Sequence, residues 1–150
     1  AVMEKLQIEP FDISSQVYSR KQDYHLVCAL NSIAISCHKF AFDLRIMQSS
    51  GFGEWMEPFS SRQVGSSAMP FKRNPIVAEK ICALARYINS LVNLSAETAA
   101  NNLLERTLDD SAARRIFLPE AFLALDEILT QTQNIIEGLI INKNNIKKNL

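Results

Sequence analysis

The stretch Gly65–Pro75 gathers the side chains of this sequence that are best suited to chemistry. It reads Gly-Ser-Ser-Ala-Met-Pro-Phe-Lys-Arg-Asn-Pro. Gly65 permits backbone conformations in which successive N–H groups point to one side, as anion-binding turns require, and Ser66 adds a hydroxyl. Lys72 contributes a positive charge and Asn74 an amide donor. These residue types predict binding of a carboxylate or a phosphate.

A serine in such a stretch can also act as a base or nucleophile, because nearby cations and oriented N–H groups stabilise its alkoxide. Composition alone, however, favours a plain connector between helices, with turn-forming serines and with Lys72 and Arg73 in solvent. The sequence contains neither the GxxxxGK[ST] motif of P-loop nucleotide hydrolases nor the GxSxG motif of α/β-hydrolases. Both of those enzyme classes are therefore disfavoured.

Long helices must position this stretch. No Gly or Pro occurs between Pro10 and Gly51, or from Ile76 to Leu118. Apolar residues recur at steps of three and four in three segments: Val27, Leu30, Ala34, Cys37, Ala41 and Leu44; Ile81, Leu84, Ala85, Ile88, Leu91 and Val92; and Leu118, Phe122, Leu125, Leu129, Ile136 and Leu139. This pattern predicts an all-α fold, an extended bundle of long helices with one long Gly/Pro-rich loop from Gly51 to Pro75.

Capping residues predict where helices begin and end. Thr107–Asp110 fits a helix start, Pro119 fits the first turn of a helix, and Gly138 fits a helix end. The polar stretch Asn142–Asn145 then indicates a boundary. We therefore predict that residues 1–141 are part of a central helical-bundle domain and that residues 142–150 begin a C-terminal domain. The chain starts at an alanine, and we expect it to be a segment of something longer.

Composition excludes several classes of protein. The 16 basic and 16 acidic residues cancel, which gives no general attraction to nucleic acid or to an anionic membrane. No segment approaches the ~18 apolar residues that a membrane span needs, and no secretion signal is evident, so we expect a cytoplasmic protein. Cys28, Cys37 and Cys82 lack metal-ligand spacing, which predicts free thiols in a reducing compartment and no metal site.

The Gly65–Pro75 stretch resembles the GSSxMPxKxNP signature of the fumarase/aspartase superfamily at all eight fixed positions. Two further blocks, Gln16–Lys21 and Glu105–Ala112, are similar to those of the adenylosuccinate lyases within that superfamily. The three blocks occur in the family's order, and the resemblance covers essentially all 150 residues.

The resemblance implies a β-elimination that breaks a C–N bond. Its members release fumarate from adenylosuccinate, giving AMP, and from the succinyl-carboxamide imidazole ribotide of purine synthesis. By this resemblance Ser66 is the base that takes the proton next to a carboxylate. Lys72 and Asn74 match positions that stabilise the carboxylate and the carbanion-like charge, a stabilisation that is strongest in the transition state. No cofactor is implied.

Further positions match residues that hold the base, succinyl group or phosphate of the nucleotide in this family: Gln16, Lys80, Arg106, Ser111 and Arg115. Ser111 and Arg115 are four residues apart and share one face of a helix, which suits a common phosphate. Lys80 supplies a point charge where relatives can carry the two-pronged Arg. Arg114 is interpreted as a solvated surface residue.

Two features depart from the family's pattern. Phe71 stands where many relatives carry His or Tyr, and it cannot donate a hydrogen bond. The superfamily's general acid, a histidine from an earlier segment, has no counterpart here. His25 and His38 lie within apolar helical patterns, and we interpret both as structural or surface residues.

The superfamily resemblance also implies a homotetramer whose helices form a common core, with each nucleotide site built from three chains and the Gly51–Pro75 loop mobile until substrate binds. Ile33, Ile35 and Phe40 lie off the main apolar stripe, and we expect other subunits to cover them. Two alternatives stay open: a non-catalytic helical oligomerisation segment, and another lyase of the superfamily such as argininosuccinate lyase.

Overall fold

The computed structural model describes residues 2–59, 73–104, 106 and 108–150. Most of the predicted signature, including Ser66, Phe71 and Lys72, lies outside the described residues. The predicted mobility of the Gly51–Pro75 loop rests on those residues and stays a prediction. The elements in chain order are α1 (Val2–Leu6), α2 (Lys21–Met47), β1 (Trp55–Met56), α3 (Ile76–Ala100), α4 (Leu108–Gly138), β2 (Ile140–Ile141) and α5 (Lys143–Asn149).

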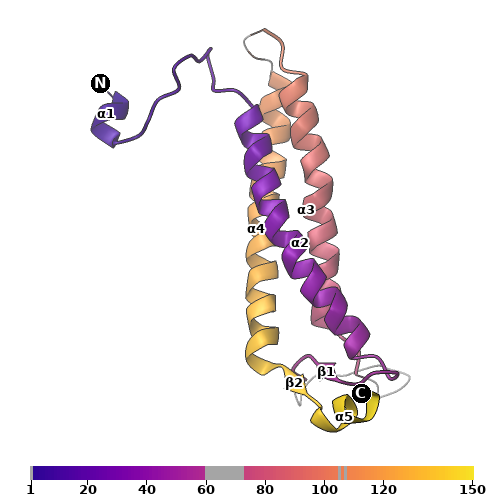
Figure 1. Ribbon diagram of the computed structural model, residues 1–150. Coiled ribbons are helices and arrows are strands. Elements are labelled where there is room, and N and C mark those ends of the chain that lie inside the picture. Colours follow the sequence, from indigo (N-terminus) through magenta and orange to yellow (C-terminus); the bar gives the residue numbers. More distant parts are fainter. Residues whose placement is uncertain (1, 60–72, 105, 107) are drawn as a thin grey trace.

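Three long helices lie side by side and account for most of the fold (Figure 1). α2 and α4 run in one direction and α3 runs in the opposite direction, so that α2 and α4 begin at the end where α3 finishes. The predicted all-α bundle of three long helices is confirmed. Freedom from Gly and Pro allows α2 and α3 to run unbroken for 27 and 25 residues.

The core lies along the axis of this bundle. Both α2 and α3 turn their predicted stripes inward: Val27, Ala34, Ala41 and Leu44 of α2 and Ile81 and Ile88 of α3 are fully buried. Cys37, Leu84 and Val92 of the same stripes are partly buried against this core, and so is Phe40, which was expected to lie off the stripe.

The predicted stripe of α4 is wrong, apart from Leu125 and the partly buried Leu118 and Leu139. The helix buries Phe117, Ala121, Ala124, Ile128 and Ile135 instead. Phe122, Leu129 and Ile136 are 49%, 45% and 59% exposed. α4 carries apolar residues on two sides, so periodicity alone could not tell which side meets α2 and α3.

Pro119 does not begin a helix, contrary to the prediction; it lies inside α4, which starts at Leu108. Proline has no backbone N–H to bond the carbonyl of Arg115 one turn earlier. Pro119 is exposed, so water can bind that carbonyl and the helix continues. The predicted end of the helix at Gly138 is confirmed.

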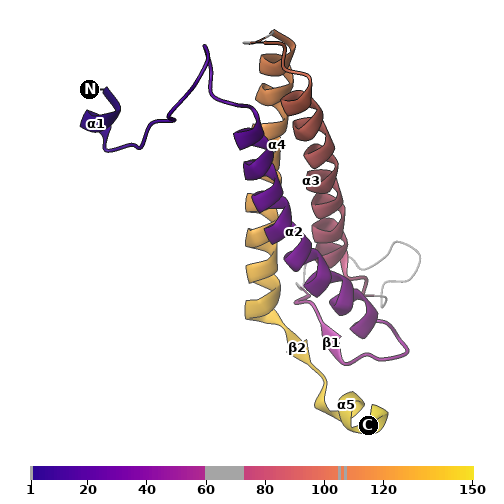
Figure 2. The same ribbon diagram turned by 45° about the horizontal axis from the view of Figure 1, so that its top comes forward.

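At the other end of the bundle, β1 and β2 form a small antiparallel pair that joins the turn after α2 to the end of α4 (Figure 2). Asn145 of α5 donates through Nδ2 to the carbonyl of Gly53 at 2.8 Å, and Asn149 donates to Glu54 Oε1 at 2.8 Å. Residues 142–150 thus contact the turn after α2. Their assignment to a separate C-terminal domain stays a prediction.

The N-terminal segment stands apart from the bundle. In both ribbon views α1 and the extended residues that follow it project sideways from the start of α2. Cys28, Cys37 and Cys82 are free thiols. Within the described ranges, no helix is long and apolar enough to cross a membrane.

Candidate functional site

The predicted site residues divide between the two ends of the bundle. Asn74 lies just before α3, at the end where α2 finishes. Arg106, Ser111 and Arg115 lie at the opposite end, around the start of α4, and Gln16 precedes the start of α2. A helix of 27 residues, the length of α2, spans about 40 Å. Ser66 and Lys72 lie outside the described residues.

The residues on either side of Asn74 are hydrogen-bonded to the end of α2 and to the segment after it. Gln48, at the end of α2, donates through Nε2 to the carbonyl of Arg73 at 3.1 Å and accepts from the Glu57 N–H at 2.9 Å. The Glu57 carboxylate accepts from the N–H groups of Val77 and Ala78 at 3.2 and 3.1 Å. The start of α3 is therefore tied to the end of α2.

Glu57 is only 2% exposed. Burial raises the pKa of its carboxyl above 4.5, although hydrogen bonds from the backbone N–H groups of α3 act in the opposite direction. A carboxylate at this position satisfies N–H groups that have no partner within the helix, and it complements the positive end of the helix dipole.

An open cavity of about 820 Å³ lies beside Asn74, between the end of α2, β1 and the start of α3. Its lining combines cations, amides and an acid: Arg45, Gln48, Arg73, Asn74 and Glu79. These groups can bind a polar anionic ligand from several sides.

Lys80 lies on the first turns of α3 and forms an ion pair with Glu127 of α4, Nζ to Oε1, at 2.5 Å. The hydrogen bond from Lys80 lowers the pKa of Glu127. Lys80 is exposed and Glu127 is half-buried. Lys80 is therefore at the same end of the bundle as Asn74 and is not grouped with Ser111 and Arg115.

The other residues predicted to hold the nucleotide lie at the opposite end of the bundle. Gln16 is exposed, Arg106 and Ser111 are half-buried, and Arg115 is exposed. Ser111 and Arg115 are one helical turn apart on α4, as predicted from their spacing. This end presents two cations, a hydroxyl and an amide, which together can bind a phosphate.

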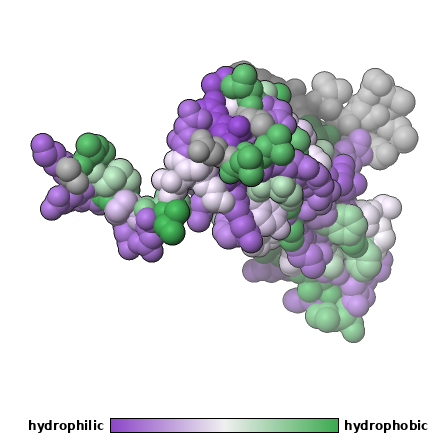
Figure 3. Space-filling model, turned by 90° about the horizontal axis from the view of Figure 1, so that it is seen from above, coloured by the Kyte–Doolittle hydropathy of each residue, from purple (hydrophilic) through white to green (hydrophobic). Residues whose placement is uncertain are grey.

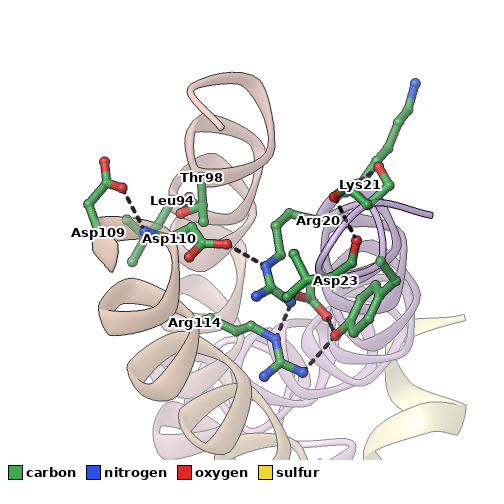
Figure 4. A network of polar contacts seen from close by, with 12 residues as sticks. Arg20, Lys21, Asp23, Leu94, Thr98, Asp109, Asp110 and Arg114 are labelled. Atoms are coloured by element: carbon green, nitrogen blue, oxygen red, sulfur yellow. Dashed lines mark hydrogen bonds and ion pairs between the residues drawn. The ribbon is translucent and has the colours of Figure 1, made fainter. Parts of the chain in front are cut away.

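A partly buried ionic network joins the segments that carry these residues (Figure 4). Arg20 donates through Nε to Asp110 Oδ2 at 2.6 Å, and Arg114 donates through Nε to Asp23 Oδ2 at 2.7 Å. Tyr18 donates to Asp23 Oδ1 at 2.5 Å and accepts from Arg114 at 2.6 Å. The interpretation of Arg114 as a solvated surface residue is wrong, because Asp23 and Tyr18 bind its guanidinium.

The contacts in this network shift the pKa values of Tyr18 and Arg114. Burial raises the pKa of Tyr18, and the neighbouring Asp23 carboxylate raises it further. Burial by itself would lower the pKa of Arg114, but the hydrogen bonds and charge interactions with Asp23 and Tyr18 together outweigh burial, and the net shift is upward. Tyr18 thus stays a neutral phenol and Arg114 a cation at neutral pH.

Sequence reasoning missed the groups that hold the site residues. Arg20 and Asp110 occur within the blocks that resemble the adenylosuccinate lyases, but nothing in the sequence pairs two residues 90 positions apart. No local sequence feature predicts that Glu57 contacts the start of α3.

His25 is exposed and His38 stacks on Phe42, with ring centroids 5.9 Å apart, in line with a structural or surface role. Among the described residues, no cluster of three His, Cys, Asp or Glu side chains could hold a metal.

Comparison with known proteins decides the family. A family model described as "Lyase" matches residues 2–89, a range that includes the whole predicted signature. The chain belongs to this lyase family. The lyase family assignment weighs against a plain connector at Gly65–Pro75.

Individual relatives agree with the lyase family assignment. The adenylosuccinate lyase of Schistosoma mansoni is 50% identical over 129 residues, which cover 86% of this chain and 26% of the relative. That of Caenorhabditis briggsae is 45% identical over 138 residues, covering 92% of this chain and 28% of the relative. The chain thus spans little more than a quarter of the length of these curated relatives. The predicted resemblance to adenylosuccinate lyases is confirmed.

The fold is also shared with solved structures of the lyase type. The fumarate lyase of Mesorhizobium sp. BNC1 superposes with a TM-score of 0.82 over 99% of this chain and 31% of its own length, at 23% sequence identity. The bundle described above is therefore a fold that a fumarate lyase also contains.

Proposed function

We propose that this chain is part of an adenylosuccinate lyase, which releases fumarate from adenylosuccinate to give AMP and acts likewise on the succinyl-carboxamide imidazole ribotide. The observation that carries the proposal is the 50% identity to an adenylosuccinate lyase over 86% of the chain. Identity at that level favours a shared substrate over that of a more distant lyase such as argininosuccinate lyase. The proposed location is the cytoplasm.

Ser66 is the proposed base in this reaction. It removes the proton next to a succinyl carboxylate, and the electron pair of the broken C–H bond becomes part of the fumarate double bond. The electron pair of the broken C–N bond leaves on the nitrogen, which takes a proton from the general acid that the resemblance implies. Lys72 and Asn74 stabilise the charge that develops on the carboxylate oxygens. The firm attachment of the Asn74 segment to Gln48 and Glu57 supports this role, because an amide donor acts best when it is held in place before the reaction.

The opposite end of the bundle is the proposed phosphate and nucleotide site. Ser111 and Arg115 share one face of α4, and Arg106 and Gln16 lie at the same end. Lys80, whose charge is already paired with Glu127, is proposed to contact the succinyl group at the Asn74 end.

These two halves are too far apart in one chain to bind one nucleotide. The length of α2 separates them by about 40 Å, which is several times the size of a nucleotide. A complete site therefore needs the Asn74 end of one subunit and the Ser111 end of another. The separation thus calls for more than one subunit, and the superfamily resemblance implies four. We therefore propose a homotetramer with helices from each subunit in a common core.

The exposed apolar surface supports this assembly. Ile33 and Ile35 of α2 are 45% and 53% exposed, and the outward face of α4 carries Phe122, Leu129 and Ile136. Viewed along the bundle, apolar side chains reach the surface between polar ones (Figure 3). A purely structural oligomerisation segment would show the same surface, so activity is the decisive test.

The test is fumarate release by the full-length protein that contains this chain. We expect turnover of adenylosuccinate and of the carboxamide ribotide, with argininosuccinate as the control substrate. Turnover of argininosuccinate in place of adenylosuccinate would reassign the substrate. Absence of turnover with every substrate would favour the structural role.

A further inference from the structure

The network of Figure 4 joins the start of α4, which carries Ser111 and Arg115, to the residues around the start of α2. We propose that the buried pair Arg20–Asp110 is a positioning device: it sets the start of α4 against the segment before α2, so that Ser111, Arg115 and Gln16 face one phosphorylated ligand. The inference rests on the proposed function and deepens it, because it assigns a role to residues that do not themselves touch the ligand.

The pair is almost completely shielded from water. The side chains of Arg20 and Asp110 are 7% and 2% exposed, and Arg20 Nε lies 2.6 Å from Asp110 Oδ2. The other oxygen, Oδ1, is buried without a hydrogen-bond partner in the described part of the chain. Arg20 is therefore the group that balances the charge of this carboxylate.

A second connection reinforces the first. Arg114, one helical turn after Asp110, binds Asp23 of α2 and the hydroxyl of Tyr18. The guanidinium groups of Arg20 and Arg114 also lie 5.1 and 5.6 Å from the centre of the Tyr18 ring. Two turns of α4 are thus attached to the residues around the start of α2.

The helix geometry explains how buried contacts can orient ligand contacts. Asp110 and Arg114 are four residues apart and share the face that meets α2. Ser111 and Arg115 each follow one of them by one residue, which is a rotation of about 100° around the helix. Holding the first face fixed therefore sets the direction of the second, which is more exposed. Gln16 precedes Arg20 by four residues.

Fold stability is a poor explanation for this pair. Two charges removed from water cost desolvation energy that their attraction does not reliably repay, and apolar residues of similar volume are often at least as stabilising. A buried Arg–carboxylate pair also fixes the relative orientation of the two segments that it joins, because the planar guanidinium binds oxygen in a restricted geometry.

The experiment uses the full-length protein and two substrates, adenylosuccinate and its dephosphorylated form, succinyladenosine. The variants are Arg20→Lys, which keeps the charge but loses the planar donor, and the double variant Arg20→Met with Asp110→Leu, which leaves no unpaired charge. Asp43→Asn is the matched control, since Asp43 pairs with Lys39 in a largely exposed ion pair on α2. We measure kcat and KM for each substrate and the thermal midpoint.

We expect both variants to keep a thermal midpoint near that of the parent and to lose roughly ten- to a hundredfold in kcat/KM for adenylosuccinate. For succinyladenosine, which has no phosphate to position, kcat/KM should stay within about twofold, because the loss is confined to phosphate contacts. Asp43→Asn should match the parent with both substrates.

Unchanged kcat/KM for adenylosuccinate in Arg20→Lys, which retains the charge that Asp110 needs, would overturn the inference. Equal losses with both substrates would also overturn it, because they would show a structural role. A parent protein that fails to turn over adenylosuccinate would instead overturn the proposed function. The two failures are therefore distinguishable.

Discussion

Glu57 illustrates what one buried side chain does in this molecule. Its two carboxylate oxygens accept hydrogen bonds from consecutive N–H groups at the start of α3, and its own N–H is bound by Gln48. The cost of this arrangement is a buried carboxylate, which is why its pKa is raised. In return, the segment that carries Asn74 has a defined position.

This shift predicts a pH dependence. The folded state holds the Glu57 proton more tightly than the unfolded chain does. Its contribution to stability is therefore complete below the unfolded pKa near 4.5 and is lost as the pH rises through the raised folded pKa. A Glu57→Gln variant lacks this titration, so the stability of the parent relative to the variant should be greater at pH 5 than at pH 7. Urea unfolding of both proteins at pH 5 and pH 7 measures the free energies of unfolding. A difference between parent and variant that is the same at both pH values would contradict the prediction.

A second prediction at the residue scale concerns the proposed base. In the full-length protein, Ser66→Ala should abolish turnover and leave substrate binding largely in place, because the hydroxyl acts in the transition state. Ser67→Ala, its neighbour, should have a milder effect. Steady-state kinetics and binding titrations separate the two effects. Near-normal turnover by Ser66→Ala would remove Ser66 from the mechanism.

At the scale of elements, the turn after α2 depends on Gly53. Its φ of +58° is a conformation that side chains with a Cβ atom rarely adopt. A Cβ atom there would also lie 2.8 Å from Nδ2 of Asn145, the side chain that ties α5 to this turn. A side chain at position 53 would therefore be opposed both by the backbone conformation and by the close contact with Asn145.

Gly53→Ala should accordingly destabilise the chain by about 1–2 kcal/mol, or more if Asn145 is displaced. Gly51→Ala is the matched control, since a Cβ atom at Gly51 has no neighbour within 4 Å. Its effect should stay within about 0.5 kcal/mol. Thermal or urea unfolding of both variants gives the comparison, and equal effects would show that the turn tolerates a side chain.

At the scale of the whole molecule, the three long helices bury one common core and leave a second apolar surface uncovered. We expect the chain to self-associate at micromolar concentration. Leu129→Lys, on the outward face of α4, should weaken the association, whereas Asn134→Lys, at an exposed polar position about 140° around the same helix, should not. Sedimentation velocity measures both, and a well-behaved monomer would count against the proposed assembly.

The chain by itself should show no lyase activity. The superfamily resemblance implies a general acid, a histidine from an earlier segment, which has no counterpart in this sequence. General acid catalysis typically contributes ~10²–10⁴-fold to the rate. Assays of fumarate release by the purified chain test this. Specific turnover would show that the described helices and the signature suffice for the reaction.

Local features of the sequence were enough to predict the three helices, the inward stripes of α2 and α3, the helix end at Gly138 and the family. Helical periodicity and the absence of Gly and Pro are properties of neighbouring residues, so they are visible before the chain folds. The signature is likewise a continuous stretch of residues.

The tertiary structure decided what depends on distant residues. α4 is apolar on two sides, and only its contacts with α2 and α3 select the face that contains Phe117 and Ile128. Pro119 is tolerated inside α4 because its side of the helix is exposed to water. The pairs Arg20–Asp110 and Lys80–Glu127 join residues 90 and 47 positions apart. The energy of such pairs depends on burial and on distances of a few ångströms, and neither exists until the helices have packed.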